Sequence, residues 1–108
     1  MIFLPEDKRI MNLLSMAQRA GKVVSGSFAS EEAMKGKKAK HILIAKDASE
    51  ESKHTFTELA GKHRVSFSFC LTKALLGKCL GKEYRAVAVL LDEGFSNSLK
   101  KLIEKGGI

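Results

Sequence analysis

Residues 21–47 read GKVVSGSFASEEAMKGKKAKHILIAKD, and this segment decides the fold. It predicts a short strand at Val23–Ser25, followed by a helix that Ser27 or Ser30 caps. The apolar run His41–Ala45 comes next and has the character of a central strand. We therefore expect a strand–helix–strand unit here.

Charged side chains cluster in the second half of this unit. Glu31 and Glu32 are expected in the first turn of the helix, and Gly36 is expected to end it. Four lysines surround that glycine, namely Lys35, Lys37, Lys38 and Lys40. We expect the lysines to lie near the free N–H groups of the helix start, a combination that suits a polyanion.

The remaining sequence continues the alternation of helices and strands. A helix is predicted from Pro5 to a left-handed cap at Gly21, and another from Ser49 to about Gly61. The later elements are a half-buried strand at 65–69, a helix from Thr72 to Gly81, an apolar strand at 86–91 and a terminal helix carrying Phe95, Leu99, Leu102 and Ile103. This order predicts an α/β fold whose sheet is covered on both faces.

Composition limits the class of partner. The 108 residues carry a formal net charge of +7, which favours an acidic partner, either nucleic acid or an anionic membrane. The longest apolar run, Ala86–Leu91, is too short to span a bilayer. Met1–Leu4 is apolar but lacks the features of a signal peptide, so we expect a cytoplasmic protein.

No catalytic or metal-binding motif stands out. The pattern of a phosphate-binding loop fails because Ser27 stands where that loop needs lysine. His41, His54 and His63 fall on three elements and are expected at the surface or at a strand edge. We expect no enzyme activity, no metal and no cofactor.

Two further residue pairs have structural interpretations. Asp47 and Asp92 each follow a strand and are expected to cap the helix that comes next. Cys70 and Cys79 are too few for a disulfide framework or a zinc site, and we expect both to be reduced, with Cys70 buried in a strand.

Five segments in order resemble the kink-turn-binding superfamily of ribosomal proteins, which includes L7Ae and L30e. They are LLSMAQRAGK (13–22), Gly26, AKHILIAKDAS (39–49), LGKCLGKE (76–83) and DEGF (92–95). The resemblance covers nearly the whole chain and is greatest to the bacterial YlxQ-like branch. It implies one domain over residues 1–108, a three-layer α/β/α sandwich with a mixed central sheet of about four strands.

The resemblance also implies an RNA site. In this family a Gly-Asn-Glu motif with a nearby lysine starts the second helix and reads sheared G·A pairs, while the loop before the last strand covers an extruded base. Here Gly26 is kept, but Ser27 replaces the asparagine and Phe28 the glutamate. Glu31 stands in place of the lysine and reverses its charge. The motif has therefore lost most of its hydrogen-bonding capacity.

The residues expected to contact RNA are Gly26, Ser27, Phe28, Ser30, Lys35, Lys37, Lys38, Lys46, Lys82, Tyr84 and Arg85. The lysines either meet phosphates or form a solvated face. Tyr84 either packs at a strand edge, which we favour, or stacks on an unpaired base. Phe28 is either a core residue, which we favour, or an exposed stacking platform.

We therefore expect a monomeric, ribosome-associated RNA-binding protein without catalytic activity, with ribosomal proteins as further partners and no membrane partner. The alternative is a protein-interaction module of the ribosome or transcription machinery that has lost kink-turn recognition. An RNA methyltransferase is disfavoured because the chain has no room for a cofactor domain.

Overall fold

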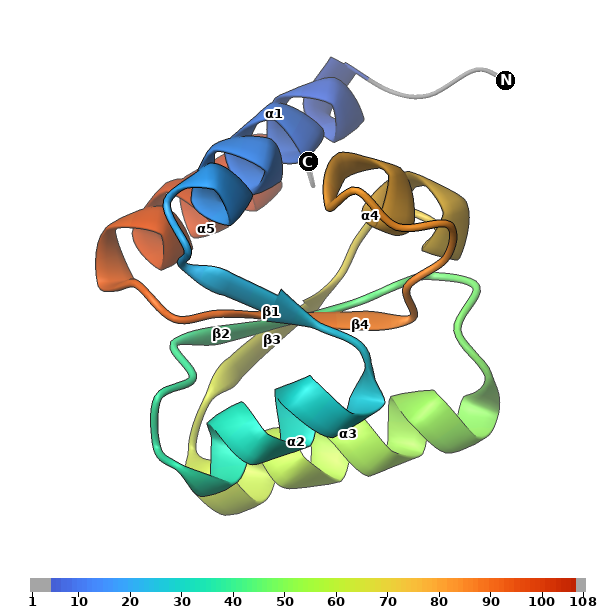
Figure 1. Cartoon of the computed structure of the whole chain (residues 1–108), viewed down its shortest axis with the longest axis vertical. Helices are drawn as coiled ribbons and strands as arrows, with labels where there is room; N and C mark the ends of the chain where they lie inside the picture. Colours follow the sequence, from blue (N-terminus) through green and yellow to red (C-terminus); the bar gives the residue numbers. More distant parts are fainter. Residues whose placement is uncertain (1–4, 107–108) are drawn as a thin grey trace.

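Helices and strands alternate through residues 5–106, the part of the chain that the computed structural model describes (Figure 1). The predictions for Met1–Leu4 lie outside that range. The elements are α1 (Pro5–Arg19), β1 (Val23–Ser25), α2 (Ser27–Lys35), β2 (His41–Ile44), α3 (Glu50–His63), β3 (Ser66–Phe69), α4 (Lys73–Cys79), β4 (Val87–Leu90) and α5 (Glu93–Gly106).

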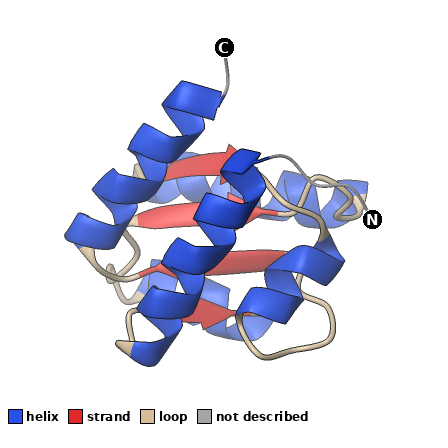
Figure 2. Cartoon of the chain, turned by 90° about the horizontal axis from the view of Figure 1, so that it is seen from above, coloured by secondary structure: helices blue, strands red, loops and turns tan. Residues whose placement is uncertain are grey.

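The four strands form one mixed sheet in the order β1-β4-β2-β3. Strand β4 runs antiparallel to β1 and β2, and β3 runs parallel to β2. Helices α2 and α3 cover one face, and α1, α4 and α5 cover the other (Figures 1 and 2). The predicted three-layer sandwich is confirmed.

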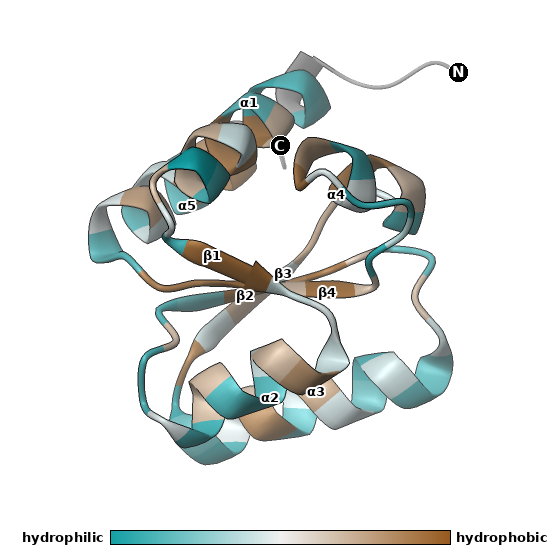
Figure 3. Ribbon diagram, in the orientation of Figure 1, coloured by the Kyte–Doolittle hydropathy of each residue, from teal (hydrophilic) through white to brown (hydrophobic). Residues whose placement is uncertain are grey.

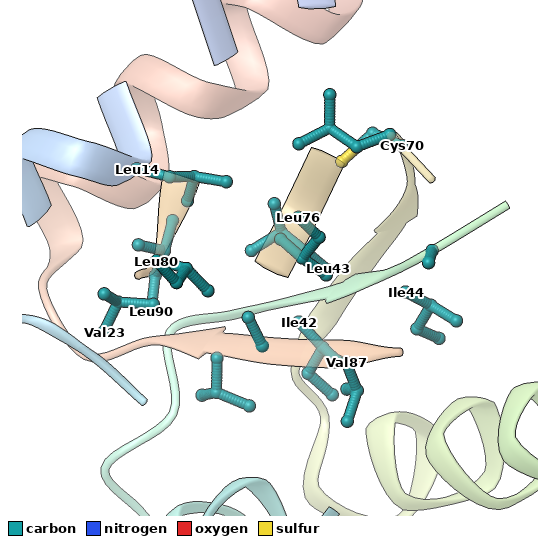
Figure 4. Close-up of a cluster of buried hydrophobic side chains, with 14 of the residues drawn as sticks. Leu14, Val23, Ile42, Leu43, Ile44, Cys70, Leu76, Leu80, Val87 and Leu90 are labelled. Atoms are coloured by element: carbon teal, nitrogen blue, oxygen red, sulfur yellow. The ribbon is translucent and has the colours of Figure 1, made fainter. Parts of the chain in front are cut away.

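The core lies on both faces of the two inner strands. Every residue of β2 and β4 is buried, which confirms the prediction of β2 as a central strand and of β4 as an apolar strand. Leu43 and Leu90 point toward the layer of α1 and α4, whereas Ile42, Ile44 and Val87 point toward α2 and α3 (Figure 4). Apolar strands between partly polar helices are also visible in the hydropathy colouring (Figure 3).

Several predicted helix ends are confirmed. Gly21 ends α1 in the left-handed region, with φ +70°. Ser49 caps α3 by accepting from the Ser52 N–H, and Thr72 caps α4 by accepting from the Leu75 N–H. Helix α3 runs past Gly61 to His63 and ends on a left-handed Arg64 instead.

The predicted start of α2 is wrong. The N-cap is Gly26, no side chain caps the helix, and no acidic residue lies in its first turn. The Gly26 N–H donates to the Val87 carbonyl oxygen 3.0 Å away, so the chain turns directly from β1 into the helix. Ser30 consequently lies inside the helix, fully buried.

Strand β3 also differs from expectation. Because it is an outer strand of the sheet, Phe67 and Phe69 remain 41% and 42% exposed. His41 is 2% exposed rather than a surface residue, since its two ring nitrogens lie 2.7 Å from the Ser66 hydroxyl and 2.8 Å from the Ser68 hydroxyl. Burial, and then the charge of Lys100, lowers the pKa of His41 to about 4.

Candidate functional site

One end of the sheet gathers the predicted site loops. There the strands β1, β2 and β3 end and β4 begins, and we call it the carboxyl end. The Gly26 N–H donates to Val87, the Ala45 N–H to Ala86 and the Lys46 N–H to Leu71, over 2.8–3.0 Å. In open α/β sheets this end is the usual place for a ligand.

The start of α2 presents open backbone donors at this end. Gly26 has φ +90°, a conformation that favours glycine. The first N–H groups of a helix have no intrahelical acceptor, and no side chain caps this one. The positive end of the helix dipole therefore faces solvent at Ser27.

Arg85 lies against this helix start. Its Nε donates to the Ser25 hydroxyl over 3.1 Å, and its Nη1 donates to the Tyr84 carbonyl oxygen over 2.9 Å. A Cβ added to Gly26 would lie 3.7 Å from the Arg85 Nε. A fixed guanidinium and the positive end of a helix thus lie side by side, an arrangement that suits an anion.

The loop before β4 is held rigidly over α4. A Cβ at Gly77 would lie 2.8 Å from the Glu83 carbonyl oxygen, so only glycine allows this approach. The Lys82 N–H donates to the Gly77 carbonyl oxygen and the Arg85 N–H to that of Lys73, over 2.8 and 3.0 Å. Close packing therefore fixes the loop that carries Tyr84 and Arg85.

Both aromatic residues of the predicted site are exposed. Tyr84 is 59% exposed in its loop, so the favoured packing at a strand edge is wrong. Phe28 is 80% exposed, so the core position that we favoured is also wrong. The buried face of α2 carries Ser30, Ala33 and Met34, and the helical period places Phe28 on the opposite side.

The predicted lysines divide between the two ends of the sheet. Lys46 and Lys82 are exposed at the carboxyl end. The Lys40 N–H instead donates to the Leu90 carbonyl oxygen, at the other end of β4. Lys35 is the last residue of α2, and Lys37 and Lys38 follow it near the same end of the sheet. The nine-residue helix is about 13 Å long. The expectation that these lysines lie beside the helix start is wrong.

Ser30 cannot belong to an exposed surface. Its residue exposure is 0%, and its hydroxyl oxygen has no hydrogen-bond partner among the described residues. Toward α3, Ser27, Glu31 and Glu51 help line a shallow cleft. Acidic side chains thus flank the helix start, and Glu31 lies 3.9 Å from Lys35 in an exposed ion pair.

The carboxylates after the strands have structural roles. Asp92 accepts from the Phe95 N–H over 2.9 Å and caps α5, as predicted. Asp47 accepts from the Lys73 N–H over 2.8 Å, so it caps α4 rather than the following helix α3. Within residues 5–106 no cluster of histidine, cysteine and acidic side chains could hold a metal ion, and no helix is long and apolar enough to span a bilayer.

Cys70 and Cys79 form no disulfide in the described part of the chain, and Cys70 is buried just beyond β3. Burial raises the pKa of the Cys70 thiol to about 12 and that of Cys79 to about 11. A thiolate is therefore disfavoured at both positions, and neither has the character of a nucleophile.

Lys62 and Arg64 are cations that the sequence analysis did not single out. They line a cleft with Lys37 at the end opposite to the carboxyl end. The predicted order of elements indicated this, because in successive strand–helix–strand units every helix ends at the same end of the sheet. The cations at the end of α3 could therefore be expected near those at the end of α2.

Comparison with known proteins gives consistent matches over most of the chain. The profile of the ribosomal protein L7Ae/L30e/S12e/Gadd45 family matches residues 8–100. The RNA-binding protein YlxQ of Bacillus subtilis is 35% identical over 92 residues, covering 85% of this chain and 92% of the relative. YlxQ of Enterococcus faecium is 32% identical over 97 residues, covering 90% and 93%.

Solved structures agree with this fold. A protein of unknown function from Bacillus halodurans superposes with a TM-score of 0.84 at 25% identity, covering 89% of this chain and 97% of its own. A 15.5kD RNA binding protein from Giardia lamblia gives a TM-score of 0.75 at 16% identity, with coverage of 96% and 89%.

Proposed function

The chain belongs to the ribosomal protein L7Ae/L30e/S12e/Gadd45 family, on its YlxQ-like branch, and on that premise we propose that it is a non-catalytic RNA-binding protein. Its target is a structured RNA, a kink-turn or a related bend. The setting is the cytoplasm, in association with the ribosome and with ribosomal proteins as neighbours, and the protein acts as a monomer.

The observation that carries this proposal is the contact between Arg85 and the start of α2. An RNA phosphate placed there would accept hydrogen bonds from the open backbone N–H groups of the helix start. It would also accept from the guanidinium N–H groups that the bonds to Ser25 and Tyr84 leave free. Lys46 and Lys82 are exposed at the same end of the sheet and would neutralise neighbouring phosphates.

Base contacts would come from the two exposed aromatic rings. Tyr84 lies in the loop before the last strand, and Phe28 lies in the first turn of α2. Stacking of an unpaired base on such a ring contributes roughly 1–3 kcal/mol. Stacking would thus replace part of the hydrogen bonding that Ser27 and Phe28 cannot provide.

Titration of labelled RNA with the protein tests this function. The probes are a kink-turn duplex, an unrelated hairpin and fragmented ribosomal RNA. We expect Phe28→Ala and Tyr84→Ala each to weaken binding of the preferred RNA by about 5- to 150-fold, the equivalent of one stacking contact. Met16→Ala is the matched control, because Met16 is 51% exposed on α1, away from the carboxyl end.

Salt dependence provides a second measurement. Neutralisation of about three phosphates by Arg85, Lys46 and Lys82 gives a slope of log affinity on log salt of about −2 to −3. An affinity that does not change with salt, or variants that match Met16→Ala, would contradict the proposed mode.

One observation favours a second candidate, a protein-docking surface. Phe28 is 80% exposed and follows Ser27, which lines the cleft that holds Glu31 and Glu51. An apolar ring beside acids suits a basic protein segment. Phosphate contacts are strongest at low salt. If none of the three RNAs binds at about 50 mM salt, the protein-docking surface is favoured.

A further inference from the structure

A second cleft lies at the end of the sheet opposite to the carboxyl end. It is lined by the residues after α2 and by the end of α3, including Lys37, Lys62, His63, Arg64 and Val65. In Figure 1 both helices reach this side of the molecule, away from the start of α2. We call it the basic cleft.

Positive charge concentrates around this cleft. Segments 33–41 and 59–66 contain five lysines and one arginine and no aspartate or glutamate, a formal +6 against +7 for the whole chain. At the carboxyl end, by contrast, Lys46 and Lys82 are each followed by an acidic residue. A dense group of positive charges therefore lies away from the family motif, at a place that could attract a polyanion.

The cations of the cleft are not consumed by ion pairs. Within the described part of the chain no carboxylate lies within 4.0 Å of the charged groups of Lys37, Lys62 or Arg64. The helix dipole places partial negative charge at the C-terminal ends of α2 and α3, which explains a cation in the last turn of each helix. It does not account for Lys37, Lys38 and Lys40 beyond the end of α2.

The backbone adds to this picture. Lys37 and Arg64 both adopt left-handed conformations, with φ +58° and +56°, each just after its helix. Glycine is the usual residue at that position, and other residues cost roughly 1 kcal/mol there. Two cations thus occupy costly positions on the rim of one cleft.

Two exposed aromatic rings follow Val65 along β3, the strand that leads from the basic cleft toward the carboxyl end. Val65 lines the cleft, and Phe67 and Phe69 follow at the alternate positions that share one face of a strand. The two rings are 41% and 42% exposed, with centroids 5.7 Å apart in an edge-to-face arrangement. Cations beside exposed rings are the combination that holds single-stranded nucleic acid.

We propose that the basic cleft is a second RNA site, which binds the phosphates of a single-stranded segment while bases rest on Phe67 and Phe69. The inference builds on the proposed function but uses a different surface. With a structured RNA at the carboxyl end, the protein would join two RNA segments across a body of 34 × 29 × 29 Å.

The test is titration of the ¹⁵N-labelled full chain with a 12-nucleotide oligouridylate, followed by amide shifts. We expect the shifts at 37–40 and 62–69. The combined variant Lys37→Gln, Lys62→Gln should bind this probe about 25-fold more weakly at 100 mM salt, with a slope on log salt shallower by about 1.4, since each phosphate contact of a single strand contributes about 0.7.

The matched control is the combined variant Lys8→Gln, Lys101→Gln, which removes the same charge from exposed positions on α1 and α5. It should bind nearly as the wild type does. Shifts confined to Gly26–Phe28 and Lys82–Arg85, or equal losses in both variants, would overturn the second site. An equally strong response to an oligoglutamate peptide would overturn RNA in favour of an acidic protein.

A separate titration with the kink-turn duplex, read at the carboxyl end, reports on the proposed function. The combined variant Lys37→Gln, Lys62→Gln should bind this duplex, which has no single-stranded tail, as the control variant does. The two proposals can therefore fail independently, because their probes and their responding residues differ.

Discussion

Replacement of Gly77 by alanine tests how the loop before β4 is held. The added Cβ would lie 2.8 Å from the Glu83 carbonyl oxygen and 2.9 Å from the Tyr84 Cα, against an ordinary contact of 3.4 Å or more. The loop must therefore retreat by about half an ångström, while hydrogen bonds to Gly77 and Lys73 hold it on both sides.

Two opposing terms set the magnitude. Overpacking of this kind costs about 1–3 kcal/mol, and alanine gains about 1 kcal/mol over glycine inside a helix. The difference predicts that Gly77→Ala lowers the free energy of unfolding by up to about 2 kcal/mol. Gly61→Ala is the control, because no atom lies within 4 Å of its added Cβ, and it should raise stability by up to about 1 kcal/mol.

Urea denaturation followed by circular dichroism measures both changes. RNA titration of folded Gly77→Ala measures the displacement of Tyr84 and Arg85, and we expect at least about a fivefold loss of affinity, one weak stacking contact. Equal unfolding midpoints for the two variants, with wild-type affinity, would refute the view that Gly77 positions this loop.

Three more outcomes follow from buried or capping groups. The pKa of His41 is about 4 in the folded chain and 6.5 in the unfolded chain, so the unfolded chain takes up a proton first as the pH falls. The free energy of unfolding should therefore fall by at most about 3 kcal/mol between pH 6.5 and pH 4. Urea midpoints across this pH range test it; His54→Gln should keep the trend and His41→Gln should lose it. Asp47→Ala should cost about 1 kcal/mol by removing the acceptor of the Lys73 N–H, and an unchanged urea midpoint would argue against this cap. Iodoacetamide should modify Cys70 only in denaturant, because burial raises its thiol pKa to about 12, and rapid labelling of the native protein at pH 8 would contradict that.

Much of the fold could be predicted from local patterns. Apolar runs identified β2 as a central strand and β4 as a second apolar strand. Ser49 and Thr72 marked the starts of α3 and α4 by residue type. These features depend on short-range spacing, which a single sequence contains. The start of α2 could not be predicted in this way, because the helix begins at a glycine turn instead of a serine cap. The Gly26 N–H of that turn donates to Val87, which is distant in the sequence.

The candidate site was harder to predict, since exposure depends on tertiary packing. Phe28 was assigned to the core because it is large and apolar, yet the helix turns it outward. The lysines after α2 were placed beside the helix start because they are close to it in sequence. A strand–helix–strand unit instead separates the two ends of its helix by the full length of the sheet.

The exposed side of β3 has a consequence for how molecules of this protein meet. An outer strand offers unpaired N–H and C=O groups to other chains. The two exposed phenylalanine rings would favour association of copies through this strand. The strand is only four residues long, and it follows immediately upon a run that contains Lys62, His63 and Arg64. Such charges act as gatekeepers against self-assembly. The cations that would hold RNA would thus also keep copies of the protein apart, so RNA that neutralises them could bring molecules together.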